Sequence, residues 1–201
     1  DHRNAQGGAR YAGHHGGEVV KAQWGHEGRE DLAGEHPFGD TGQLVLLVAF
    51  LAVWIVDSFV LRASIFPARF VPLLARIVLG GSFIGAAWYF ANKGMRVVFA
   101  ERREVPAVIE TGVFRRVRHP IYLGCILFYI GCVVFTLSVF SFFVLVAIVI
   151  FYHYIARHEE RLLRAKFGAA YELYTRRVPM WLPRIRLRDG GKAGFNGEVM
   201  E

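Results

Sequence analysis

TGVFRRVRHPIYLG, residues 111–124, is the stretch that decides how this chain is organised. It places three arginines and a histidine directly before an apolar run that reaches residue 155, in which the one acidic or basic side chain is His153. Because bilayer hydrocarbon makes charge expensive, we expect Arg118 and His119 where membrane meets water. Ionisable groups at such a position are candidates for a functional site.

Apolar residues make up 54% of the 201 residues and come in blocks rather than alternating with polar ones. A soluble domain is usually less apolar, and a membrane-spanning helix needs roughly 17–25 residues. We therefore predict an all-α integral membrane protein with about four transmembrane helices, at 44–61, 71–91, 121–137 and 139–155. The last two are expected to form a helical hairpin that turns at residues 136–138.

The net charge of +7 is unevenly distributed. Seven Lys or Arg residues fall in 93–118 and ten follow from Arg157 onward, whereas the connector 62–70 has two. The positive-inside rule then predicts a multi-pass protein whose basic segments, and with them the candidate active site, lie on the cytoplasmic face. Because these charges flank predicted spans, we expect membrane lipids as partners and no nucleic acid.

Four regions are predicted along the chain. Residues 1–42 are polar and rich in Gly and His, and we expect a disordered segment; its histidines have no standard metal-site spacing, so no metal is expected. Residues 43–92 hold the first two spans, 93–183 contain the hairpin, the following helix and the candidate site, and 184–201 are a polar tail.

Several local expectations complete the fold prediction. A β-prone element is expected around residues 97–99. After the hairpin, helical periodicity over 157–174 predicts an amphipathic cytoplasmic helix, with one face formed by Glu160, Leu163, Phe167, Tyr171 and Tyr174.

Four polar or small positions inside the predicted spans have structural interpretations. The spacing of Gly81 and Gly85 favours a close helix contact. Asp57 is expected to be paired or interfacial, and Arg76 to extend toward the membrane surface, although both also suit a cavity lining.

The polar residues at the ends of the hairpin suggest a ligand site. Pro120 suits the first turn of a helix, which places His119 at a helix N-terminus, where an anion is favoured, and Arg118 beside it. A hairpin that returns to the same side brings Glu159 and Glu160 close to them. Opposite charges at one membrane edge suit a zwitterion, whereas in the plainer interpretation they are topological anchors and surface salt bridges worth ~0–1 kcal/mol.

Three spaced motifs occur in this half of the chain: RHPxYxG at 118–124, EExxL at 159–163 and FGxxYxxYxxxVPxxLP at 167–183. In combination they resemble the isoprenylcysteine carboxyl methyltransferase family over about residues 80–183, and the related phospholipid N-methyltransferases share much of the pattern. The resemblance implies an integral membrane enzyme that uses S-adenosylmethionine without a Rossmann domain, with residues 93–183 as the cofactor-binding catalytic region.

The resemblance also implies roles for individual residues. Catalytic positions would be Glu160 and, near the reacting carboxylate of the acceptor, Arg118 and Arg177. Cofactor-binding positions would be His119, Tyr122, Gly124, Glu159 and Glu160. Substrate-binding positions would be Tyr171 and Tyr174.

The expected reaction is methyl transfer to a lipophilic or small acceptor, with an isoprenylcysteine-like carboxylate favoured. A phospholipid amine and a thiol are the alternatives. A carboxylate is already ionised at pH 7, whereas an amine or thiol has to lose a proton to Glu159, Glu160 or His119. Two other classes stay open: an NADPH-dependent membrane reductase and a non-catalytic membrane protein. Oligomeric state is not predicted.

Overall fold

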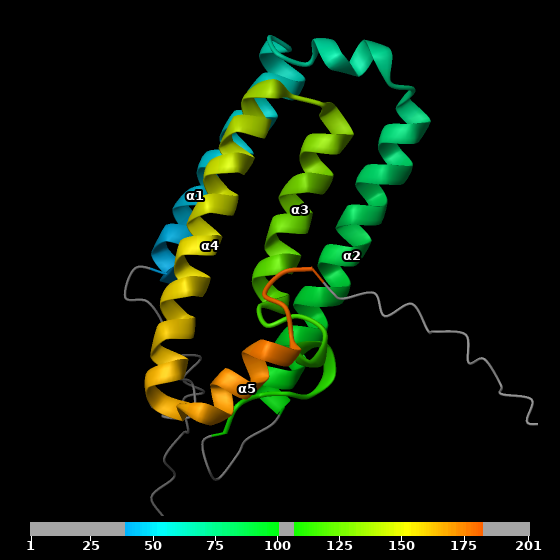
Figure 1. The fold of residues 1–201 in the computed structure, drawn as a ribbon. Coiled ribbons are helices and arrows are strands. Elements are labelled where there is room, and N and C mark those ends of the chain that lie inside the picture. The colour runs from blue at the N-terminus through cyan, green and yellow to red at the C-terminus, as the bar shows by residue number, and fades with distance from the viewer. Residues whose placement is uncertain (1–38, 101–106, 183–201) are drawn as a thin grey trace, which may run out of the picture.

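The computed structural model describes residues 39–100 and 107–182, and its regular elements there are all helical. Four long helices and one short one are joined by π-helical and 3-10 segments (Figure 1). In chain order they are α1 (Gly39–Ile55), a π-helical segment (Val56–Leu61), a 3-10 segment (Phe66–Phe70), α2 (Leu73–Ala100), a 3-10 turn (Gly112–Arg115), α3 (Pro120–Thr136), α4 (Val139–Phe167) and α5 (Ala169–Arg177).

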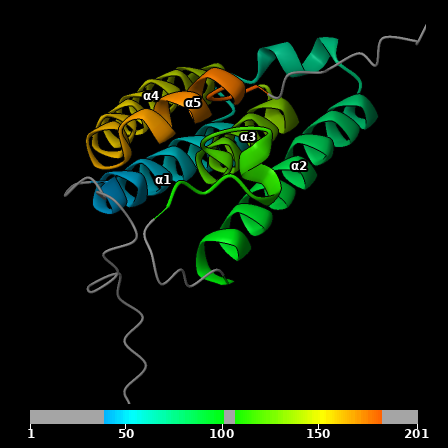
Figure 2. The same ribbon diagram turned by 60° about the horizontal axis from the view of Figure 1, so that its bottom comes forward.

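The four long helices lie side by side and α5 crosses one end of them (Figure 1). In the same view α3 lies between α4 and α2, with α1 beside α4. The α1–α2 connection and the α3–α4 turn share the end opposite to α5. Figure 2 shows α5 and the segment leading into α3 on the same end of the bundle. The candidate site residues of the sequence motifs therefore converge at the α5 end.

Three helical stretches are long and apolar enough to cross a membrane: Thr41–Leu61, Leu73–Val98 and Val139–Phe167. The helix Pro120–Thr136 is apolar but has only 17 residues. The described residues thus form an all-helical bundle typical of a multi-pass membrane protein. A fourth span and the cytoplasmic placement of the short C-terminal helix stay predictions.

The boundaries of several predicted elements change. The expected β-prone element at 97–99 is wrong, because α2 continues as a helix to Ala100. Tertiary contacts explain the extension: a Cβ added to Gly94 would lie 2.7 Å from Cγ1 of Ile121, and one added to Gly112 would lie 2.9 Å from Cγ2 of Val97. Packing against the start of α3 therefore overrides the local preference of a few valines.

The hairpin turn is confirmed at residues 136–138. Leu137 takes a left-handed conformation (φ 55°, ψ 35°), which is uncommon for a residue other than glycine. Ser138 then caps α4 by accepting the backbone N–H of Ser141 at 3.1 Å.

The close contact between α2 and α3 uses other small residues than expected. A Cβ added to Gly81 or Gly85 would meet nothing within 4 Å, so the predicted contact there is wrong. One added to Gly80 would lie 3.0 Å from the carbonyl oxygen of Gly131, and one added to Gly124 would lie 2.9 Å from that of Ala87. Small residues let these two backbones approach closely.

Helix α4 runs through the predicted last span and on to Phe167, and Gly168 (φ 52°) then breaks it. The single helix expected over 157–174 is therefore two helices. The predicted face nevertheless stays together, because Leu163 and Phe167 of α4 pack against Tyr171 and Tyr174 of α5.

Asp57 and Arg76 both lie near the end opposite to α5. The Asp57 carboxylate accepts hydroxyl groups of Ser64 and Ser138, each at 2.5 Å, and is 3% exposed, which confirms that it is paired. Arg76 donates Nη1 to the carbonyl oxygen of Phe135 at 3.1 Å, in the last turn of α3. The predicted segment 1–42 lies largely outside the described residues, except that α1 begins at Gly39, and 184–201 lies wholly outside them.

Candidate functional site

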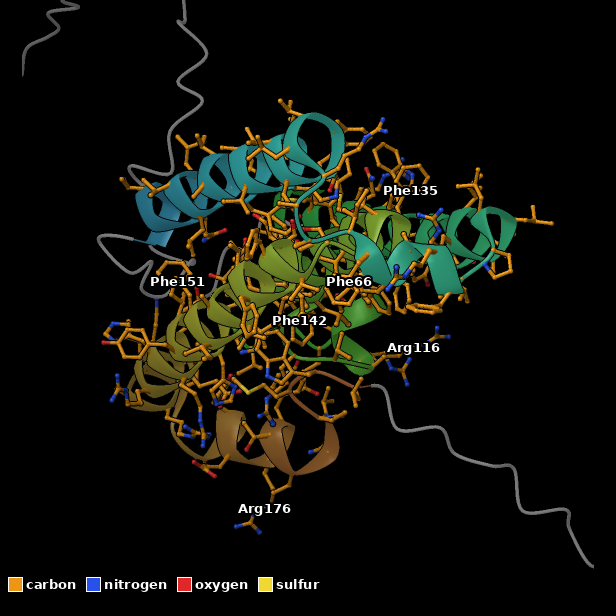
Figure 3. All side chains as sticks on the ribbon, turned by 90° about the horizontal axis from the view of Figure 1, so that it is seen from above. Phe66, Arg116, Phe135, Phe142, Phe151 and Arg176 are labelled. Carbon is orange, nitrogen blue, oxygen red and sulfur yellow. The ribbon has the colours of Figure 1, made fainter. Side chains whose placement is uncertain are left out.

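Arg118 is at the centre of the polar cluster at the α5 end. Its Nε donates to Oε1 of Glu160 at 2.7 Å, and its side chain is 11% exposed. Its Nη1 donates to the carbonyl oxygens of Thr175 (3.0 Å) and Val178 (2.9 Å). The arginine thus joins the start of α3, the part of α4 that lies at the α5 end, and the C-terminal end of α5. By contrast, Arg116 and Arg176 point away from the bundle (Figure 3).

Glu160 is fully buried and is held by two arginines. Besides Arg118, Nη2 of Arg164 lies 3.2 Å from its Oε2, one helical turn along α4. Arg164 also reaches Glu172 of α5, with Nε 3.1 Å from Oε1. A buried carboxylate needs such compensation, because removal of its partners leaves an unpaired charge.

His119 lies between the two carboxylates. Its Nδ1 is 3.6 Å from Oε2 of Glu159, and its Nε2 is 3.5 Å from Oε1 of Glu160. The residue is buried, and Nε2 makes no hydrogen bond within the described part of the chain.

Aromatic rings flank His119. The Tyr122 ring is stacked on the imidazole (centroids 5.7 Å apart, interplanar angle 4°), and its hydroxyl donates to Glu159. On another side the Trp181 ring lies 5.9 Å from the imidazole. The Trp181 Nε1 donates to Nδ1 of His153 at 3.2 Å, which ties the C-terminal segment to α4.

Tyr171, Tyr174 and Val178 form a small core under the site. The Tyr174 hydroxyl donates to the carbonyl oxygen of Phe114 at 2.8 Å, and the backbone N–H of Arg118 donates to that of Pro179 at 3.0 Å. Burial raises the pKa of both tyrosines well above the ordinary value. They therefore stay protonated through the physiological range and fix α5 against the segment that precedes α3.

The structure brings most of the predicted site residues together, and their chemical roles stay predictions. Arg118, His119, Tyr122, Glu159 and Glu160 form one cluster, with Tyr171 and Tyr174 adjoining it. Arg177 is exposed in the last turn of α5, and the ion pairs of Glu160 go to other arginines. Gly124 is buried against Ala87 and Ala91, so its small size is already explained by the contact with α2.

The plainer interpretation of Glu159 and Glu160 as members of surface salt bridges allowed for Arg164 as a partner, but the pair that Arg164 forms with Glu160 involves a buried carboxylate. The spacing of Arg164 four residues after Glu160 was a readable signal for an ion pair. Sequence reasoning missed Trp181 as part of this arrangement. Nothing in the sequence indicated that the Trp181 ring would lie beside His119, since an aromatic residue near a span commonly marks the membrane interface.

Comparison with known proteins gives these contacts a chemical context. Residues 73–170, which include α2, α3 and α4, match the family model of the phospholipid methyltransferases. This part of the chain is similar to the phospholipid methyltransferases. The finding agrees with the wider group indicated by the sequence motifs, and it does not support the isoprenylcysteine branch specifically.

Two curated methyltransferases are similar in sequence. A methanethiol S-methyltransferase of Crocosphaera subtropica is 30% identical over 145 residues, which cover 67% of this chain and 52% of that protein. Methanethiol S-methyltransferase 2 of Bradyrhizobium diazoefficiens is 37% identical over 82 residues, which cover 38% of this chain and 29% of that protein. The chain thus spans about half the length of the first relative and less than a third of the second. No solved structure matches the chain.

Proposed function

We propose that this chain is an S-adenosylmethionine-dependent integral membrane methyltransferase that acts on a small lipophilic thiol, with its site at the α5 end on the cytoplasmic face. The observation that carries the proposal is the cluster of His119, Tyr122, Glu159 and Glu160 at the end of apolar helices. A polar cofactor and a lipophilic acceptor can meet at such a boundary. The names of the two relatives support the thiol.

The residues fit the cofactor. When bound, it supplies a methyl group on a sulfonium, and it also carries an ammonium and a carboxylate. The carboxylate of Glu159, whose side chain is 20% exposed, suits its positive groups, whereas both oxygens of Glu160 already contact arginines. Tyr122 is placed to orient Glu159. The main contribution of these residues is positioning, which can supply ~7–11 kcal/mol.

The charge balance favours a thiol over a carboxylate acceptor. Arg118, the expected partner of an acceptor carboxylate, already binds Glu160 and two backbone carbonyls. The side chains around His119 are acidic and aromatic, which disfavours a second anionic group. The isoprenylcysteine-like carboxylate therefore has less support and stays a prediction. A phospholipid amine is the second candidate, because residues 73–170 match the phospholipid methyltransferases.

The test begins with calorimetric titration of the detergent-purified protein with S-adenosylhomocysteine, beside NADPH. Binding of S-adenosylhomocysteine is expected, weakened at least tenfold in Glu159→Gln and unchanged in the exposed control Arg176→Gln. Methyl transfer is then measured by mass spectrometry with an alkyl thiol, phosphatidylethanolamine and a farnesylated cysteine. Binding of NADPH instead, or of neither ligand, would contradict the proposal; transfer to the amine or carboxylate alone would correct its acceptor.

A further inference from the structure

His119 is a buried group of the site whose hydrogen-bonding capacity is incompletely used. Its side chain is 6% exposed, and its Nε2 makes no hydrogen bond among the residues that the structure describes. The facing Oε1 of Glu160, 3.5 Å away, already accepts Nε of Arg118 at 2.7 Å. Buried polar atoms without partners are few in native structures, so this one needs an explanation.

The charged and titratable groups around the imidazole come from two helices. From α4, Glu159 faces Nδ1 and Glu160 faces Nε2. From α3, Tyr122 stacks on the ring and donates its hydroxyl to Glu159. The C-terminal segment contributes Trp181, which does not titrate. The neighbouring Arg118 is neutralised by Glu160.

This arrangement suits an imidazole that takes up a proton. A carboxylate beside one ring nitrogen orients the ring and stabilises its protonated form, and the other nitrogen is left to accept a proton. The other two candidates are engaged: both oxygens of Glu160 contact arginines, and Glu159 accepts the Tyr122 hydroxyl. Among the three possible bases, His119 is the one with a buried nitrogen that makes no hydrogen bond in the described part of the chain.

We infer that His119 is the general base that deprotonates the acceptor thiol, an inference that rests on the proposed thiol methyl transfer. The thiol proton moves to Nε2 of His119. The sulfur then forms a bond to the methyl carbon while the bond from that carbon to the sulfonium sulfur breaks, which leaves a neutral thioether and neutral S-adenosylhomocysteine. The proton passes from His119 to solvent before the next turnover.

Access to Nε2 requires a neighbouring side chain to move, because the atom is buried. The Trp181 ring is beside the imidazole, and its hydrogen bond to His153 holds it on α4. We therefore expect the tryptophan fluorescence of the protein to change when the thiol binds, and this change to be lost in Trp181→Phe.

The test compares two thiols in His119→Asn and in the control His158→Asn. His158 lies on α4, and its Nδ1 is 3.2 Å from Nη2 of Arg161. With an alkyl thiol that is protonated at the assay pH, His119→Asn is expected to lose about 100- to 10,000-fold in rate. With an aromatic thiol that is already ionised, the loss is expected to stay below about tenfold. The affinity for S-adenosylhomocysteine is expected to stay within threefold.

Two further measurements distinguish a general base from a structural role of His119, and neither depends on the variant folding. In the parent protein, kcat/KM is expected to rise with pH through one ionisation for the alkyl thiol only. Nuclear magnetic resonance of ¹³C-labelled histidine is expected to show one ring gaining a proton when the alkyl thiol binds beside S-adenosylhomocysteine. If His119→Asn lowers the rate equally with both thiols, or if its main effect is on the affinity for S-adenosylhomocysteine, the base assignment is overturned. If the parent binds no S-adenosylhomocysteine or methylates no thiol, the proposed function itself has failed.

Discussion

Arg118 and Glu160 form a buried ion pair that holds three segments of the chain together. The Nε–Oε1 distance is 2.7 Å, Glu160 is 0% exposed, and the same guanidinium binds the last carbonyls around α5. The pair therefore connects the start of α3, the polar part of α4 and the end of α5. An arginine that the family resemblance would place at a reacting carboxylate acts here as the structural centre of the cluster.

Arg118→Gln is expected to destabilise the protein strongly. The substitution leaves Glu160 with Arg164 alone and frees two backbone carbonyls, and breaking a buried pair typically costs about 3–5 kcal/mol. Thermal unfolding in detergent should show a markedly lower Tm. Arg118→Lys should recover little of it, because an ammonium lacks the fork that reaches Glu160 and the carbonyls together.

The control for this prediction is Arg176→Gln, whose side chain points away from the bundle (Figure 3). Its Tm should match that of the parent. A parental Tm in Arg118→Gln would show that the pair does not hold the segments.

Gly124→Ala and Gly81→Ala are expected to have opposite effects. A Cβ at Gly124 would lie 2.9 Å from the Ala87 carbonyl oxygen, whereas one at Gly81 would meet nothing within 4 Å. Overpacking costs typically about 1–3 kcal/mol, and replacing an exposed helical glycine by alanine gains up to about 1 kcal/mol. Unfolding in detergent should therefore show Gly124→Ala less stable than the parent and Gly81→Ala equal or more stable. Equal destabilisation of the two would contradict the observed helix contact.

The hairpin and its charges were predictable from the sequence, because an apolar run of known length returns the chain to the side where it started. On this basis Glu159 and Glu160 were predicted to lie close to Arg118 and His119. The face of α2 that meets α3 was predicted wrongly. A helix that is apolar on all sides does not show which face is buried against another helix, because lipid is as apolar as a neighbouring helix.

A finer pattern in α2 does mark the contact. Gly80, Ala87, Ala91 and Gly94 recur at helical spacing on the side that meets α3. The pair Gly81 and Gly85, which matched a known motif, lies on another face. The break at Gly168 was not predicted either, because the residues on both sides continue one apolar face and the positive φ of a glycine is decided by packing.

Asp57→Ala is expected to lower stability and leave cofactor affinity unchanged. The Asp57 carboxylate accepts hydrogen bonds from Ser64 and Ser138, which tie the π-helical segment after α1 to the α3–α4 turn at the end opposite to α5 (Figure 1). Each buried donor left without an acceptor costs about 1–3 kcal/mol. Asp57→Asn, which keeps an acceptor oxygen, should lose less.

Ser82→Ala on the exposed side of α2 is the control for Asp57→Ala and should leave the Tm unchanged. Calorimetry with S-adenosylhomocysteine supplies the second readout. A loss of affinity in Asp57→Ala at a temperature where the protein is folded would mean that the two ends of the bundle are coupled.

Alkaline pH is expected to destabilise the protein through the tyrosines of α5. Burial raises the pKa of Tyr171 and Tyr174 in the folded state, whereas in the unfolded state it returns to about 10. The folded form therefore keeps these protons to higher pH than the unfolded form does. Their contribution to stability is complete below pH 10 and falls as the pH rises above it.

Tyr171→Phe isolates this effect, because it removes a titrating hydroxyl while the ring stays packed on Tyr174 (centroids 5.8 Å apart). Unfolding monitored between pH 8 and about 11 should show a smaller decline in the variant than in the parent. Tyr174→Phe should show the same smaller decline together with a lower Tm at every pH, because it also removes the hydrogen bond to Phe114 (2.8 Å). Parallel stability curves for the parent and Tyr171→Phe would mean that the buried tyrosine does not titrate differently in the two states.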